Sequence, residues 1–158
     1  MTKIKTKRER VKFASDNVTG ACPEVLNAVL KANEDDKTPY GNDELSKNLQ
    51  NKFSEIFEKE VVVFPTASGT AANALALSTM TPSFGNIYCH RLSHINVDEC
   101  GAPEFYTGGA KLVNLDGNNG KIIAEELDNN ISGKGVVHHT QPSSVSITQL
   151  CETGVAYN

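Results

Sequence analysis

Apolar residues repeat at intervals of three or four positions in two stretches near the start of the chain. The first stretch opens at Pro23, a residue favoured at the start of helices, and predicts a helix to about Asn33. The second follows Asp43, a typical N-cap, and predicts another helix. Its apolar stripe consists of Leu45, Leu49, Phe53, Ile56 and Phe57. Between the two helices, Pro39-Tyr40-Gly41 predicts a turn.

The rest of the chain alternates β-branched runs with helical patterns. These patterns predict strands over 61–64, 86–89, 111–115 and 143–150, helices over 70–80 and 122–130, and a turn over 116–120. Strands separated by helices are typical of an α/β layer. We therefore expect an α/β fold with a largely parallel sheet. Because no closing element follows the last strand, we also expect an open sheet edge and a partial domain.

The segment that joins Val63 to the helix over 70–80 is the most informative part of the sequence. Here Ser68, Gly69 and Thr70 form a small-residue turn between a predicted strand and a helix. The first N–H groups of a helix have no partner within it, and the helix dipole adds partial positive charge there. A phosphate can bind these groups and the two hydroxyls, and Gly69 allows close approach. The same residues also fit a plain N-capped helix.

Composition adds limits to this picture. A chain of 158 residues with 39% hydrophobic and 22% charged residues fits one globular domain or part of a larger one. The net charge of −4 gives no reason to expect a nucleic acid or a membrane as partner. The four cysteines are widely spaced without a Cys-x-x-Cys motif, which argues against a zinc site and a disulfide framework. We expect a cytoplasmic protein without a metal, and a basic tail over 1–12.

Several segments, taken in order, resemble the low-specificity threonine aldolases. These are pyridoxal-phosphate enzymes of the β-eliminating lyase group with the aspartate-aminotransferase-like fold. The segments are Phe13-Ala14-Ser15-Asp16-Asn17, Tyr40-Gly41-Asn42-Asp43, Ser68-Gly69-Thr70-Ala71-Ala72-Asn73, His94 through Glu99 to Gly101-Ala102, and His138-His139-Thr140-Gln141-Pro142 with Val145-Ser146-Ile147-Thr148-Gln149. The resemblance covers the chain from about residue 11 to its end, but only about the first half of a family member.

The resemblance implies how the cofactor is bound. Ser68, Gly69 and Thr70 match the turn that binds the phosphate of pyridoxal 5′-phosphate. His94 matches the histidine that stacks on the cofactor ring and serves the retro-aldol reaction. A lone histidine is often structural, yet this one follows a predicted strand end, where α/β sheets place their ligands. An imidazole there can accept a proton near neutral pH.

Three further residues match positions that contact the substrate: Ser15, Tyr40 and Glu99. Without the family, Ser15 and Tyr40 also fit turn residues, and Glu99 also fits the solvated face of a short helix. His138 and His139 are adjacent, so in a strand they would point to opposite faces. Cys151 lies where other branches of the family carry a functional histidine. The roles of these last three residues stay open.

The resemblance also implies that residues 13–158 are the incomplete amino half of the large domain, part of a three-layer sandwich. A complete protein would cleave L-threonine or a related β-hydroxy amino acid to glycine and an aldehyde, as a homodimer or homotetramer. The family's Schiff-base lysine lies further along, and we interpret Lys134 in Ser132-Gly133-Lys134-Gly135 as a loop lysine. The implied expectation is that this chain alone is an inactive fragment.

Two alternatives stay open at this stage. One is another pyridoxal-phosphate lyase or aminotransferase of the same fold, such as a tryptophanase-type eliminase, although these often have an aromatic ring at the position of His94. The other is a non-catalytic α/β module that binds phosphate.

Overall fold

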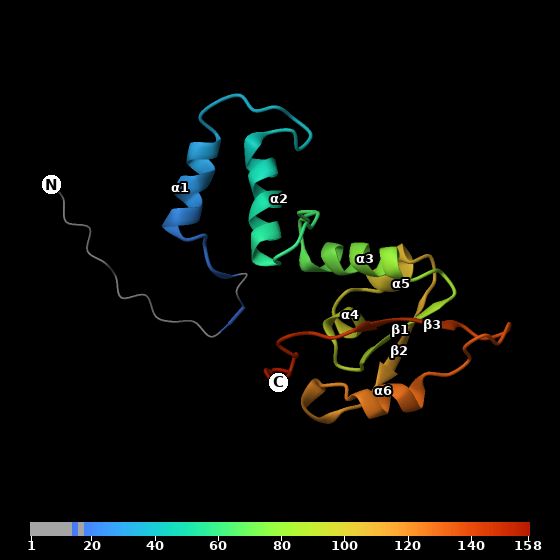
Figure 1. Cartoon of the computed structure of the whole chain (residues 1–158). Coiled ribbons are helices and arrows are strands. Elements are labelled where there is room, and N and C mark those ends of the chain that lie inside the picture. The colour runs from blue at the N-terminus through green and yellow to red at the C-terminus, as the bar shows by residue number, and fades with distance from the viewer. Residues whose placement is uncertain (1–13, 16–17) are drawn as a thin grey trace. The chain divides into compact units, whose positions relative to one another are not determined.

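The structure, a computed structural model, describes residues 14–15 and 18–158 (Figure 1). They form two compact units that divide between Val63 and Phe64. The basic tail predicted over 1–12, and Phe13, Asp16 and Asn17 of the first family-like segment, lie outside the described residues. No helix in the described ranges has the length and apolar character needed to cross a bilayer.

The first unit contains the two helices that the sequence predicts, α1 (Pro23–Ala32) and α2 (Glu44–Ile56). Asp43 caps α2, as expected. Its Oδ1 accepts a hydrogen bond from the Ser46 N–H at 2.9 Å and its Oδ2 accepts one from the Ser46 hydroxyl at 2.7 Å. Tyr40 lies in the predicted turn with a φ of 62°, in the left-handed region.

The strand predicted over 61–64 is wrong: this segment is irregular. Side chains of α2 bind the backbone groups that a neighbouring strand would otherwise bind. Gln50 accepts from the Val63 N–H at 2.8 Å and donates to the Val63 carbonyl at 3.1 Å. Ser54 Oγ accepts from the Val61 N–H at 3.2 Å. Because these groups are satisfied locally, the β-branched run does not need a sheet partner.

The second unit is built on a three-stranded sheet with the order β2-β1-β3. Its strands are β1 (Gly85–His90), β2 (Lys111–Leu115) and β3 (Gln141–Ser146), and both pairings are parallel. All six residues of β1 are buried, as befits the central strand of a sheet covered on both faces. The parallel sheet therefore confirms the predicted α/β class.

Alternation along β1 separates two packing layers. Ile87 and Cys89 point to one face, where they pack with Leu77 of α3 (Gly69–Met80). Tyr88 points to the other face, in a cluster against which Leu127 of α6 (Ala124–Asn130) packs. Figure 1 shows α3 and α6 on opposite sides of the sheet. The result is a sandwich of helix, sheet and helix.

Two short helices, α4 (His94–Val97) and α5 (Ala102–Tyr106), are not predicted by the sequence. Both lie on the α3 side of the sheet, since Ile95 belongs to the Leu77 cluster and α5 contacts α3. Helices of four or five residues complete too few turns to give a periodic pattern. The turn predicted over 116–120 is present and contains a short 3₁₀ helix, η2 (Asn118–Gly120).

The last strand is shifted from its predicted range of 143–150. β3 begins two residues earlier, at Gln141, and ends at Ser146. Its pairing with β1 ends where Ser146 lies opposite Cys89, one residue before β1 itself ends. No described strand lies beyond that point to pair with 147–150, so the alternating pattern there does not continue the sheet.

Helix α3 runs antiparallel to β1. Just beyond its carboxyl end, Thr81 Oγ1 lies 2.8 Å from Ser144 Oγ, and a Cβ added to Gly85 at the start of β1 would lie 2.6 Å from Thr81 Cγ2. Near its amino end, Asn73 hydrogen-bonds Glu99, which follows the end of β1. The amino terminus of α3 is thus placed at the carboxyl edge of the sheet, where α/β proteins bind ligands.

Packing of α3 against the sheet predicts unequal effects for two leucines on the same helix. Leu77 is 4% exposed and Leu75 is 45% exposed. We expect Leu77→Ala to lower the free energy of unfolding of the second unit by about 2–5 kcal/mol, because it leaves a cavity in the core. Leu75→Ala, the matched control, should cost less than about 1 kcal/mol. Hydrogen exchange of the β1 amides measures both, and equal losses would contradict this packing.

Candidate active site

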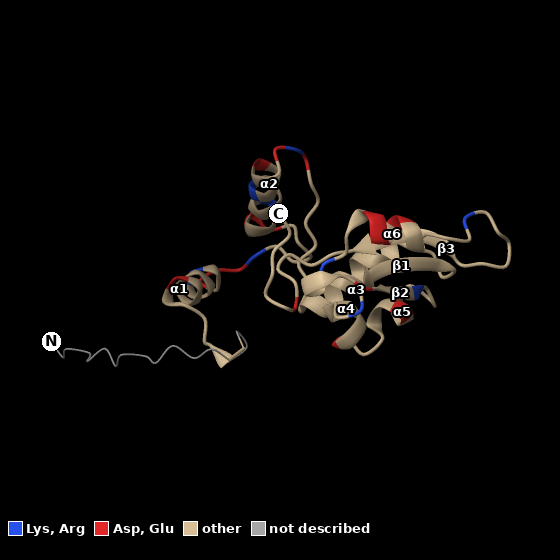
Figure 2. Cartoon of the chain, turned by 90° about the horizontal axis from the view of Figure 1, so that it is seen from below, with Lys and Arg blue, Asp and Glu red and all other residues tan. Residues whose placement is uncertain are grey.

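The first turn of α3 has free hydrogen-bond donors. Ser68 is the N-cap, and its Oγ accepts from the Ala71 N–H at 3.2 Å. Among the described residues, the N–H groups of Gly69 and Thr70 have no acceptor. The first turn contains no acidic residue, and Figure 2 draws α3 in tan, the colour of uncharged residues. The positive end of the helix dipole is therefore not neutralised by its own side chains.

The space beside this turn is open. A Cβ added to Gly69 would meet no other atom within 4 Å. Next to it, an open groove is lined by residues that include Ser68, Thr70 and Tyr106. Glycine at this position keeps the backbone free to approach an anion, which is the condition for binding a phosphate at a helix terminus.

A chain of hydrogen bonds joins α3 to His94 at the start of α4. Glu99 Oε1 accepts from Asn73 Nδ2 at 2.6 Å and lies 2.8 Å from His94 Nδ1. The side chain of Glu99 is 0% exposed, whereas that of His94 is 46% exposed. The structure thus brings two predicted site residues together, and it excludes a solvated helix face for Glu99.

The carboxylate of Glu99 raises the pKa of His94 above the ordinary value for histidine. The cause is mainly the hydrogen bond, since the charges of Glu99, Glu152 and Asp98 contribute less and partial burial opposes the shift. A raised pKa means that the folded state favours the imidazolium. The stability gained is fully present below the pKa in the unfolded chain and is lost as the pH rises through the pKa in the folded protein.

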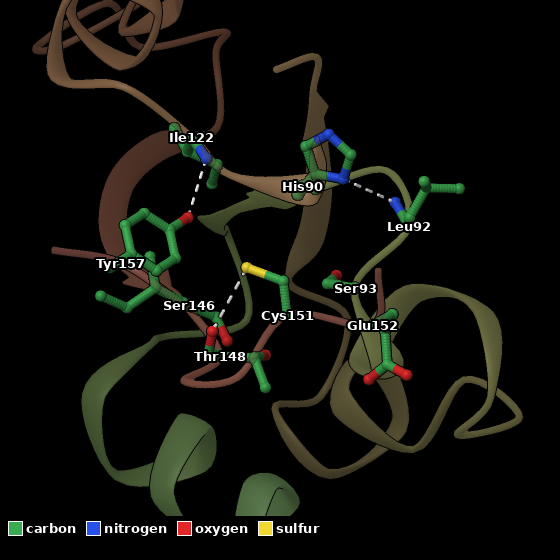
Figure 3. Close-up of a pocket in the computed structure, with 11 residues that line it drawn as sticks. His90, Leu92, Ser93, Ile122, Ser146, Thr148, Cys151, Glu152 and Tyr157 are labelled. Atoms are coloured by element: carbon green, nitrogen blue, oxygen red, sulfur yellow. Dashed lines mark hydrogen bonds between the residues drawn. The ribbon is translucent and has the colours of Figure 1, made fainter. Parts of the chain in front are cut away.

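The carboxyl edge of the sheet also encloses a small cavity of about 10 Å³, enough for one water molecule. Figure 3 shows Ser93, Cys151 and Glu152 grouped around it. Cys151 is buried, and its Sγ lies 3.5 Å from the Thr148 carbonyl. Ser93, which lines this cavity, directly precedes His94 in the sequence.

The other histidines are placed away from this arrangement or have structural contacts. His90, at the end of β1, accepts from the Leu92 N–H through Nδ1 at 3.1 Å, so its Nε2 donates to the Gly117 carbonyl at 3.1 Å. His138 and His139 lie in exposed turn positions before β3 and not within the strand. The opposite-face argument for a strand therefore does not apply to them.

A family model for β-eliminating lyases matches residues 12–158. The chain belongs to the β-eliminating lyase family. Members of this family are pyridoxal-phosphate enzymes. The match spans both units and every segment on which the resemblance was based.

Two curated relatives give the same assignment. The chain is 38% identical to a low-specificity L-threonine aldolase of Pseudomonas sp. (strain NCIMB 10558) and 36% identical to one of Pseudomonas aeruginosa. Each match covers 92% of this chain and 42% of the relative. This chain therefore spans less than half the length of these relatives.

A solved structure of Leishmania major threonine aldolase has the same fold. It superposes with a TM-score of 0.81 over 89% of this chain and 41% of that chain, at 24% sequence identity. At this identity the likeness establishes the fold, which agrees with the predicted aspartate-aminotransferase-like domain.

Ser15 and Tyr40, two predicted substrate contacts, lie in the first unit. Both are exposed, and the Tyr40 side chain has little cover, with 96% of the residue accessible. Their predicted contact with substrate stays a prediction.

Sequence reasoning missed Asn73 as a hydrogen-bond donor to Glu99, and Glu152 as a charge that raises the pKa of His94. Asn73 lies within a quoted family-like segment, and it is the one amide in an otherwise small or apolar run over 69–77. This contrast is the sequence signal that could have identified Asn73 as a residue with a specific partner. Glu152 is 58 positions from His94, a separation that no local pattern bridges.

The Glu99–His94 contact predicts a measurable change in the titration of His94. In Glu99→Gln, the pKa of His94 should fall towards the ordinary value of about 6.5, because the charged hydrogen-bond acceptor is gone. NMR titration of the imidazole ring protons measures this shift. Glu125→Gln, an exposed acidic residue in the first turn of α6, is the matched control. An unchanged His94 titration in Glu99→Gln would contradict the contact.

Proposed function

We propose that this chain provides the cofactor phosphate site and the ring-stacking histidine of a pyridoxal-phosphate-dependent aldolase. The reaction would cleave L-threonine or a related β-hydroxy amino acid to glycine and an aldehyde. The observation that carries the proposal is the pair of hydrogen bonds that Glu99 makes with Asn73 and His94. These bonds connect a half-exposed imidazole to α3, the helix with free N-terminal donors. The two Pseudomonas relatives, both L-threonine aldolases, support the choice of reaction.

The phosphate would bind at the amino end of α3. The free N–H groups of Gly69 and Thr70, the hydroxyls of Ser68 and Thr70, and the uncompensated helix dipole all favour an anion. Hydrogen bonds to a charged group are shorter and stronger than neutral ones, so a few donors suffice to anchor a phosphate ester. The open space at Gly69 admits it.

His94 would cover the ring of the cofactor and handle the proton of the substrate hydroxyl. When bound, pyridoxal phosphate supplies an electron sink for the charge left on the α-carbon as the Cα–Cβ bond breaks. The hydroxyl must lose its proton for that bond to break. His94 Nε2 has no hydrogen-bond partner among the described residues, so it is free to take this proton directly or from a water molecule.

The remaining parts of the proposal rest on the family alone. Ser15 and Tyr40 would contact the amino-acid substrate, while Glu99, being fully buried, would act through His94. Residues 13–158 would be part of the large domain, and the complete protein would be a cytoplasmic homodimer or homotetramer.

Pyridoxine 5′-phosphate tests the cofactor site in this chain, because it lacks the aldehyde and cannot condense with lysines. We expect it to shift the amide NMR signals of Gly69, Thr70 and Ala71 and the ring signals of His94. Thr70→Val should weaken binding about tenfold, since one hydrogen bond to a charged group is lost. Pyridoxine without the phosphate is the control ligand. Shifts that bypass the start of α3 would refute the phosphate site.

The aldolase reaction is tested in the full-length protein. Reconstituted with pyridoxal phosphate, it should absorb in the visible range and release acetaldehyde from L-threonine. His94→Ala should lower turnover at least about a hundredfold, because a positioned base is lost. His138→Ala, in an exposed turn, is the control. A protein that stays colourless, or a His94→Ala variant with unchanged kinetics, would argue against this function.

A further inference from the structure

We propose that Asn73 is a positioning residue that sets the tautomer of His94. By donating to Glu99 Oε1, Asn73 holds this carboxylate as the acceptor for a proton on His94 Nδ1, so that the neutral imidazole presents a lone pair on Nε2. The use of that lone pair as a base rests on the proposed function. The tautomer itself does not, because it depends only on residues of this chain.

Because Glu99 is buried, the stability of its carboxylate depends on its hydrogen bonds. Its side chain is fully buried, and Oε2 has no partner among the described residues. Both of its hydrogen bonds therefore converge on Oε1, from Asn73 at 2.6 Å and from His94 at 2.8 Å. A buried carboxylate is costly unless donors compensate its charge, so each of the two donors is important.

The amide of Asn73 determines the hydrogen-bonding role of Glu99 Oε1. Its Nδ2 can only donate, so Oε1 must accept from it. A carboxylate that accepts on Oε1 also favours the arrangement in which His94 donates from Nδ1. The second ring nitrogen of a neutral histidine is then an acceptor.

The place of Asn73 in α3 fits such a role. Asparagine is a weaker helix former than the alanines on either side of it, and here it lies in the second turn of the helix. Its side chain reaches across 26 positions of sequence to Glu99, whereas the nearby polar side chains Ser78 and Thr79 bond only to carbonyls of their own helix. Asn73 thus couples the phosphate-binding helix to the orientation of the imidazole.

The test is the tautomer of His94 in the 158-residue chain, read from its ring ¹⁵N shifts at a pH above the His94 titration. The wild type should carry the proton on Nδ1. In Asn73→Ala and in Asn73→Leu, the ratio of the Nδ1–H to the Nε2–H form should fall about tenfold. Leucine has nearly the shape of asparagine and is a good helix former, so this variant preserves the packing of α3.

Asn96→Ala is the matched control, since Asn96 lies on the same short helix as His94 but donates to the Arg91 carbonyl. It should leave the tautomer ratio unchanged. A wild-type His94 with its proton on Nε2, or Asn73 variants with an unchanged ratio, would overturn the proposal. If the ratio falls but pyridoxine 5′-phosphate shifts no signal at the start of α3, the positioning role stands and the proposed cofactor site fails.

Discussion

The arrangement of the candidate site depends on one buried group, the carboxylate of Glu99. A carboxylate removed from water needs donors close by, and Glu99 has two, from Asn73 and His94. These donors belong to α3 and α4, which are separated in sequence by the whole of β1. Satisfying this one group therefore fixes the imidazole relative to the helix that precedes the sheet.

The fold explains why this contact forms at the carboxyl edge of the sheet. β1 is buried along its full length, and α3 packs antiparallel to it through Leu77. The end of α3 is joined to β3 by Thr81 and Ser144, so its beginning projects over the opposite edge. Free helix donors, a half-exposed imidazole and the cavity near Cys151 are thus gathered in one region. This placement is general for parallel α/β sheets, and its chemistry here comes from the side chains.

The sequence predicts what local patterns determine. Helices with a repeating apolar stripe or a clear N-cap, such as those starting after Asp43 and Ser68, are found where expected. The strand over 61–64 fails because Gln50 and Ser54 satisfy its backbone groups, which β propensity alone does not reveal. Likewise, the alternating pattern over 147–150 does not continue β3, because no described strand pairs with these residues.

In the candidate site too, the features set by local sequence can be predicted and those set by tertiary contacts cannot. A helix terminus suited to phosphate can be found from Ser68-Gly69-Thr70, because capping and dipole effects are local. The burial of Glu99 cannot be predicted in this way, because the side chain is enclosed by tertiary contacts that include Asn73 and not by a local pattern. The partnership of Asn73 with Glu99 is equally a tertiary contact, visible only once α3 is placed on the sheet.

In the proposed site, a phosphorylated pyridine ring would bind at the start of α3 with His94 lying against it. Intermolecular nuclear Overhauser effects between pyridoxine 5′-phosphate and the chain test this most directly. We expect cross-peaks from the pyridine methyl or ring protons to the His94 imidazole, together with perturbed amide signals at Gly69 and Thr70. A bound ligand whose cross-peaks lead to other side chains and not to His94 would contradict it.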